Sequence, residues 1–211
     1  MKLYNFFRSS AAYRVRIALN LKGLPYDYVP VHLTKDGGEH KRDEFRAVNP
    51  LMRVPALVLS NGDILTQSLA IIEYLDEVFP DPALLPTDSI ERARVRAVAQ
   101  IVACDIHPLN NSGTMAYLRK TLAQDQQAID VWYASWITSG FTAIEAMIDP
   151  KPYSFGNHPG LADICLVPQV YNARRANVPL DAFPKILATE VACYKLAAFD
   201  QARPELQTDA E

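Results

Sequence analysis

Hydrophobic and polar positions follow different periods in the two parts of the chain. Up to about residue 80, short apolar runs typical of strands alternate with helical repeats, whereas the remainder carries helical repeats only. The pattern predicts the order β-α-β-(α)-β-β-α for the first part. The expected strands cover 2–6, 26–31, 56–59 and 63–65, the helices 12–22 and 67–78, and the polar segment 35–50 is expected to be a loop with a short irregular helix.

Glycine and proline punctuate these elements. Gly23 and Pro25 end the first helix. Pro30 has no N–H to donate, so the strand at 26–31 is expected at the edge of the sheet. Asn61-Gly62 predicts a hairpin closed by a type I′ turn.

A proline-rich stretch from 81 to 88 has the composition of a linker between two domains, 1–80 and 89–211. Four helices are expected after it, at 89–120 with a kink at Pro108, 126–147, 161–174 and 186–199. The tail after Pro204 is polar and is expected to fray. The predicted fold is an α/β domain followed by an all-α domain.

The composition, 49% hydrophobic and 21% charged, is that of an ordinary globular protein. No apolar run approaches the ~20 residues that cross a bilayer, and the start lacks a secretory apolar region, so a cytoplasmic protein is expected. Cys104, Cys165 and Cys193 are far apart and form no C-x-x-C pair. This spacing supports neither a disulfide framework nor a metal site.

The net charge of −3 hides an asymmetry, because residues 1–60 hold ten Lys and Arg against five Asp and Glu. A basic first part would suit a small anionic ligand, although a solvated basic face is an equally good interpretation. Basic residues are not clustered with aromatic ones, so nucleic acid is a less favoured partner.

Two predicted helix starts are candidate anion sites, because helix N-termini present free N–H groups and a positive dipole. At the first, Ser9 and Ser10 add hydroxyl groups and Arg8 a permanent charge, which together would stabilise a thiolate. At the second, Ser68 is the donor. In both cases simple capping, by Ser10 or Ser68, is the alternative interpretation. The bond Val54-Pro55 is expected to be trans from base rates alone.

Three blocks resemble one known family. Residues 8–19, RSSAAYRVRIAL, closely resemble the RSSCSxRVRIAL signature of zeta-class glutathione transferases, and the runs QSLAIIEYL at 67–75 and LADICLVPQV at 161–170 match two further blocks. The resemblance extends from Met1 to about residue 198. It implies a thioredoxin-like N-terminal domain, an all-helical C-terminal domain, a homodimer and a cis Val54-Pro55 bond.

The resemblance also implies glutathione as the cofactor. Ser9 would donate to its sulfur, with the N–H groups of Ser10 and Ala11 nearby. The remaining implied cofactor contacts are His40, Val54, Pro55, Gln67, Ser68, His107, Asn111 and Ser112.

Zeta-class members isomerise maleylacetoacetate, and bacterial relatives isomerise maleylpyruvate. The implied catalytic residues are Ser9, Ser10, Arg8, Arg175 and His107, the arginines being candidates for substrate carboxylates. For His107, a hydrogen-bonded core histidine is the alternative. His107 and Asn110 slightly favour the maleylpyruvate branch.

Two departures from the family pattern bear on function and stability. Ala11 and Ala12 replace the Cys-Ser of the signature, which disfavours chemistry through a mixed disulfide. Gly160 stands where a Ser or Thr helix cap is usual, and a small loss of stability is expected. A transferase acting on α-halo acids and a non-catalytic glutathione-binding module remain alternative functions.

Overall fold

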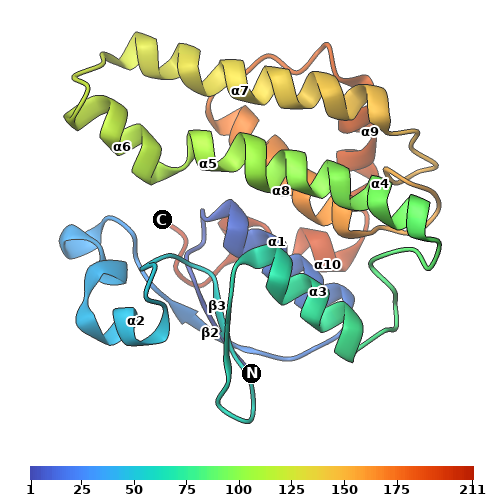
Figure 1. The fold of residues 1–211 in the computed structure, drawn as a ribbon, viewed down its shortest axis with the longest axis horizontal. Helices are drawn as coiled ribbons and strands as arrows, with labels where there is room; N and C mark the ends of the chain where they lie inside the picture. Colours follow the sequence, from blue (N-terminus) through green and yellow to red (C-terminus); the bar gives the residue numbers. More distant parts are fainter. The chain divides into compact units, whose positions relative to one another are not determined.

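A computed structural model describes all 211 residues. Contacts divide the chain into two compact units, shown in Figure 1. The N-terminal unit comprises 1–83 together with 195–211, and the helical unit comprises 84–194. This division differs from the expected one, because the last 17 residues group with the N-terminal unit rather than with the helices that precede them.

The N-terminal unit contains a four-stranded mixed sheet of order β2-β1-β3-β4. The strands are β1 (Lys2–Asn5), β2 (Asp27–Pro30), β3 (Ala56–Val58) and β4 (Ile64–Thr66). β2 runs parallel to β1, whereas β3 and β4 are antiparallel to their neighbours. Pro30 therefore lies in an edge strand, as its missing N–H predicts.

Two helices, α1 (Ser10–Leu21) and α3 (Ser68–Val78), pack against each other in this unit, and their bounds agree with the sequence pattern within about two residues. The polar segment between β2 and β3 contains the predicted short helix, α2 (Asp43–Val48), after two 3₁₀ turns, η1 (Lys35–Gly37) and η2 (Glu39–Lys41). The predicted element order is confirmed.

The hairpin between β3 and β4 is confirmed, but its predicted turn type is wrong. A type I′ turn needs positive φ at both central residues, and here only Gly62, at φ +93°, has it. Gly62 N–H donates to the Leu59 carbonyl at 3.0 Å, and Leu59 N–H donates to Asp63 O at 2.8 Å. The side-chain oxygen Oδ1 of Asn61 accepts from Asp63 N, so Asn61 serves as an Asx turn residue.

The first expected long helix of the helical unit consists of four segments that differ in helical geometry. These are α4 (Ser89–Gln100), a π-helical segment η3 (Ile101–Ile106), α5 (His107–Asn110) and α6 (Ser112–Lys120). Pro108 cannot donate the hydrogen bond of a regular helix, which explains the wider π turn just before it. The chain then leaves helical geometry at Asn111, with φ −73° and ψ 165°.

The remaining helices of this unit are α7 (Gln126–Met147), α8 (Leu161–Arg175) and α9 (Pro184–Cys193). α8 is buried along most of its length, and its last two residues, Arg174 and Arg175, are exposed. A Cβ at Gly160, before α8, would lie 2.9 Å from the Leu84 carbonyl oxygen, so a larger cap does not fit. Asp163 instead accepts hydrogen bonds from the N–H groups of Gly160 and Ser154. No helix of the structure is both long and apolar enough to cross a bilayer.

The single helix expected at 186–199 is also wrong. α9 ends at Cys193, and a separate short helix, α10 (Ala197–Asp200), packs on α1 in the N-terminal unit. A 3₁₀ turn, η4 (Pro204–Leu206), follows. The tail is not frayed, because Asp209 and Glu211 hydrogen-bond to residues of the N-terminal unit.

Candidate active site

A tight turn carries the chain from β1 into α1. The N–H of Ser9 donates to the Phe6 carbonyl at 2.9 Å, and Phe7 and Arg8 occupy the centre of the turn. Ser9, rather than Ser10, is the N-cap, and its Oγ accepts from Ala12 N at 3.2 Å. Since this bond uses a lone pair of Ser9, the hydroxyl hydrogen is left to donate to a bound anion. Ser10 is the first residue of α1 and is buried.

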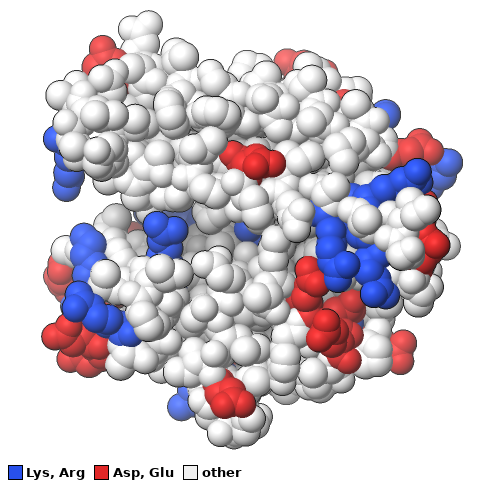
Figure 2. All heavy atoms as spheres, in the orientation of Figure 1, with Lys and Arg blue, Asp and Glu red and all other residues white.

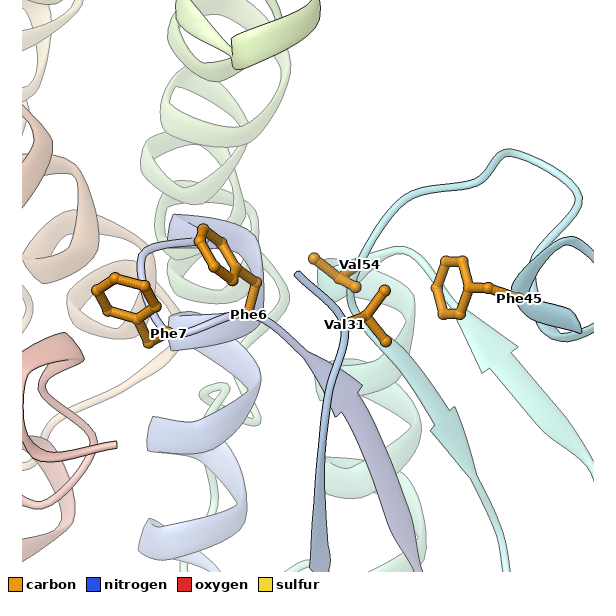
Figure 3. Close-up of a cluster of buried hydrophobic side chains, with 5 residues drawn as sticks. All are labelled: Phe6, Phe7, Val31, Phe45 and Val54. Atoms are coloured by element: carbon orange, nitrogen blue, oxygen red, sulfur yellow. The ribbon is translucent and has the colours of Figure 1, made fainter. Parts of the chain in front are cut away.

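The side chain of Arg8, in the centre of this turn, is exposed to solvent. Its guanidinium carbon lies 5.0 Å from the ring centroid of Phe7 and 5.8 Å from that of Phe6, within the range of cation–π attraction. Figure 3 shows the two rings on the turn; they belong to a hydrophobic cluster that also includes Val31, Phe45 and Val54. The two buried rings therefore support the charged side chain of Arg8 in one position.

The start of α3 provides the second anion site. Gln67, its exposed N-cap, has φ +68° and ψ 117°, a strained conformation for a side chain with a Cβ. Ser68 follows as the first helical residue and is buried. Its Oγ accepts a hydrogen bond of 3.2 Å from Nη1 of Arg14 in α1. The two helix starts are therefore tied together by a charged group.

In the sequence between the two helix starts, the chain enters β3 through a cis Val54-Pro55 bond. The family resemblance is right here and the base-rate expectation of a trans bond is wrong. Val54 is 9% exposed and lies in the hydrophobic cluster with Phe45 of α2 (Figure 3). Its backbone directly precedes β3, and the contact of Val54 with glutathione stays a prediction.

His40 lies in η2, after a glycine that makes room for it. A Cβ on Gly38 would come within 2.5 Å of the His40 ring, and Gly38 has φ +101°. Burial, and to a smaller degree the charge of Lys41, lowers the pKa of His40. His40 is therefore mainly neutral at pH 7 in the free protein.

The basic excess of the first 60 residues does not form an uninterrupted patch. Basic and acidic side chains lie side by side over α2 and the turns before it (Figure 2). Arg42 pairs with Asp36 and Glu39, and Arg46 with Asp43. Much of the charge is thus neutralised locally, away from the two helix starts.

Three predicted site residues lie together in the helical unit. His107 begins α5 and is half-buried, and Ser112 begins α6 and is exposed. Asn111 between them is an N-cap, since its Oδ1 accepts from Gly113 N and Thr114 N at 2.8 and 3.0 Å. Its Nδ2 donates to the Pro108 carbonyl. Capping accounts for Asn111 fully, and its predicted cofactor contact stays a prediction.

Arg175, the last residue of α8, is exposed and hydrogen-bonds the hydroxyl of Tyr133 in α7. Burial raises the pKa of Tyr133, and the positive charge of Arg175 opposes the rise. Sequence reasoning missed Tyr133, because one tyrosine on a helix has no distinguishing local pattern. Its neighbour Arg174 points to a different partner, Glu190, at 2.5 Å.

These residues supply donors, helix N-termini and cations, but no nucleophile of their own. All three cysteines are free thiols, Cys165 and Cys193 being buried and Cys104 exposed in η3. No group of three metal-binding side chains is present. Within the N-terminal unit, the two helix starts with Ser9, Ser68 and Arg8 can bind an anionic thiol compound, lower the pKa of its thiol and bind a carboxylate beside it.

Comparisons with known proteins agree with this chemistry. The family model for the glutathione S-transferase N-terminal domain matches residues 8–78, and that for the C-terminal domain matches 126–206. The chain belongs to the glutathione S-transferase family. A maleylpyruvate isomerase of Ralstonia sp is 54% identical, with both chains covered completely.

Two solved structures indicate the class to which this glutathione S-transferase belongs. The holo form of a maleylpyruvate isomerase, described as a bacterial zeta-class enzyme, is 53% identical over both whole chains, with a TM-score of 0.95. A maleylacetoacetate isomerase of Anaeromyxobacter dehalogenans, with dicarboxyethyl glutathione and citrate in its active site, is 38% identical. It covers 100% of this chain and 97% of its own, with a TM-score of 0.87. The predicted zeta-class membership is confirmed.

Proposed function

We propose that this glutathione S-transferase is a glutathione-dependent cis–trans isomerase of maleyl diketo acids. The observation that carries the proposal is the Ser9 cap, whose hydroxyl oxygen is held by Ala12 while its hydrogen remains available to a thiolate at the start of α1. The isomerase names of the relatives, at 54% and 38% identity, support it.

Glutathione supplies the nucleophile. Its thiolate adds to the carbon–carbon double bond of the cis substrate, and the electron pair moves onto the conjugated carbonyl oxygen as an enolate. The former double bond, now single, rotates. The enolate then re-forms the carbonyl and expels the thiolate, leaving the trans product and unchanged glutathione.

The adduct in the related structure supports this route. Dicarboxyethyl glutathione has the composition expected when a thiol adds across the double bond of a butenedioic acid. That addition is the first half of the proposed reaction. The absence of a cysteine at position 11 removes a competing thiol from the loop of this chain.

We assign the charged groups of the substrate to the arginines. Arg8 is exposed beside Ser9 and is supported by two aromatic rings, and Arg175 is held by Tyr133. A guanidinium binds a carboxylate through two parallel hydrogen bonds. Ser68 and Gln67, at the start of α3, are assigned to the γ-glutamyl carboxylate, and His40 to the other end of glutathione.

Maleylpyruvate is the substrate that the proposal favours over maleylacetoacetate. The 54% identical relative carries that name, and so does the structure with a TM-score of 0.95. A homodimer, implied by the resemblance, and a cytoplasmic location belong to the same proposal.

The decisive experiment follows the absorbance of each cis substrate in parallel, with glutathione, without it, and with S-methylglutathione. We expect turnover with glutathione alone, faster for maleylpyruvate, with no net consumption of the thiol. S-methylglutathione fills the site without a nucleophile and should inhibit. Turnover without glutathione, or net loss of glutathione to an α-halo acid with no isomerisation, would contradict the proposal.

A further inference from the structure

The C-terminal tail contacts the turn that precedes α1. Asp209 Oδ2 accepts a hydrogen bond of 3.1 Å from the backbone N–H of Phe7, across 202 positions of sequence. Its other oxygen, Oδ1, accepts from the hydroxyl of Tyr28 in β2. Both carboxylate oxygens are thus bound to residues of the N-terminal unit.

The carbonyl of the same residue, Phe7, is held by Arg16. Nη2 of Arg16 donates to it at 3.0 Å, while Nη1 donates to Asn5 Oδ1 at 3.0 Å. The guanidinium also donates from Nε and Nη2 to the carbonyl of Ala202 in the tail, at 3.1 and 3.0 Å. Both backbone polar groups of Phe7 are therefore held by side chains that are themselves bonded to, or part of, the tail.

The two groups that hold the backbone of Phe7, the guanidinium of Arg16 and the carboxylate of Asp209, carry opposite charges. Arg16 is completely buried, and burial is the main cause that lowers its pKa; the negative charge of Asp209 opposes this only weakly. Removing Asp209 thus removes an anion from the surroundings of a buried cation, in addition to one hydrogen bond.

The position of Phe7 affects the site, because Phe7 is a central residue of the turn that ends at Ser9. The turn is closed by one hydrogen bond, from Ser9 N to Phe6 O. A rotation of the Phe7 peptide would displace Arg8, stacked on the Phe7 ring, and the Ser9 hydroxyl together. Displacements of about 1 Å at a reacting centre cost large factors in rate.

We propose that Asp209 is a positioning residue for the reaction, holding Phe7 so that the turn presents Ser9 to the glutathione thiol and Arg8 to the substrate. The roles of Ser9 and Arg8 here rest on the proposed function. Asp209 itself touches neither cofactor nor substrate. A tail that only stabilised the fold would give different results in the following experiment.

The test compares Asp209→Ala with the unmodified chain. The pKa of bound glutathione is measured from the ultraviolet absorbance of the thiolate, with the S-methylglutathione complex as the blank. We expect the bound thiol pKa to rise by about 1 and kcat at neutral pH to fall about tenfold. Affinity for S-methylglutathione should stay within about twofold, since the start of α3 is unchanged.

Three further variants separate position from stability. Asp209→Asn keeps an acceptor oxygen for Phe7 N–H and should restore most of kcat. Asp209→Glu keeps the charge but moves the carboxylate by one methylene, and should shift the thiol pKa by an intermediate amount. Glu205→Ala removes an exposed carboxylate from the same tail and should leave the thiol pKa and kcat unchanged.

A lower melting temperature for Asp209→Ala, with wild-type thiol pKa and kcat, would overturn the proposal and leave Asp209 a structural role only. If that variant does not fold, the Asp209→Glu variant decides in the same way. If the unmodified chain binds glutathione but isomerises neither substrate, the proposed function fails. The thiol titration still tests Asp209 in that case, because it needs only bound glutathione.

Discussion

Arg14 Nη1 donates to Ser68 Oγ at 3.2 Å and so joins the second turn of α1 to the first turn of α3, across 54 positions of sequence. Both side chains are buried, at 1% and 6% exposure. A permanent positive charge therefore lies between the two helix starts, one proposed for the thiolate and the other for the γ-glutamyl carboxylate. The relationship makes each half of the glutathione site depend on the other.

Replacing Ser68 with alanine should weaken this link. Arg14 would lose an acceptor for a buried N–H, so we expect the free energy of unfolding to fall by about 1–3 kcal/mol. The dissociation constant of glutathione should rise about tenfold, since the hydroxyl is also lost to the cofactor. Isothermal titration and chemical denaturation measure the two effects. Ser60→Ala, at an exposed position in the β3–β4 hairpin, is the control and should change neither.

Replacing Ser9 with alanine should raise the pKa of bound glutathione by about 1, toward the ordinary thiol value of about 8.5. The fraction of thiolate at pH 7 and kcat should fall with it. Loss of the cap should also cost about 1 kcal/mol of stability. Ultraviolet titration of the thiolate and steady-state kinetics provide the measurements.

The matched control for Ser9→Ala is Asp125→Ala. Asp125 caps α7 through a 2.8 Å bond from Ala128 N, as Ser9 caps α1. Its loss should lower stability by a similar amount without changing the bound thiol pKa. Equal effects of both variants on activity would mean that Ser9 acts through helix stability alone.

Arg175 and Arg174 are adjacent, but only Arg175 is expected to bind substrate. Arg175→Ala should raise the KM for the dicarboxylate about 10- to 100-fold, the loss of a charge-assisted hydrogen-bonded pair. Tyr133→Phe, which removes the hydroxyl that holds Arg175, should raise KM by a smaller factor. Arg174→Ala breaks the pair with Glu190 and should lower stability with KM unchanged. An unchanged KM in Arg175→Ala would remove Arg175 from the site.

The lowered pKa of His40 gives glutathione binding a pH dependence of defined sign. In the free protein His40 is neutral over a wider range, so its contribution to folding stability is present above about 6.5 and lost as pH falls through its folded pKa. A glutathione carboxylate beside it would raise that pKa in the complex. Binding should therefore take up a proton, and affinity should increase as pH falls from 7 to 6.

Calorimetry in two buffers of different ionisation enthalpy measures this proton uptake directly. His40→Gln should abolish it, whereas His158→Gln, at an exposed position, should retain it. Proton uptake of the same size in both variants would show that His40 does not contact glutathione.

Local sequence patterns correctly predicted those elements that depend only on their own residues. α7 begins at Gln126 and ends at Met147, as its helical repeat predicts, and Pro30 places β2 at the edge because a missing donor is a property of one residue. Where a local signal had two solutions, the prediction was less accurate. Asn61-Gly62 marks a hairpin in either turn type, and Pro108 disturbs the helix ahead of it as well as at its own position.

The amino-acid sequence alone determined the order of strands and helices, the family and the two serine-bearing helix starts, because each is encoded by neighbouring residues or by motifs within one block. Only the tertiary structure decided which groups hold those starts in place. The contacts Arg14–Ser68 and Asp209–Phe7 join residues far apart in the chain, and so does Tyr133–Arg175 at the end of α8. An acidic residue in a polar tail carries no local sign of its partner, since folding alone brings the tail back to the first turn.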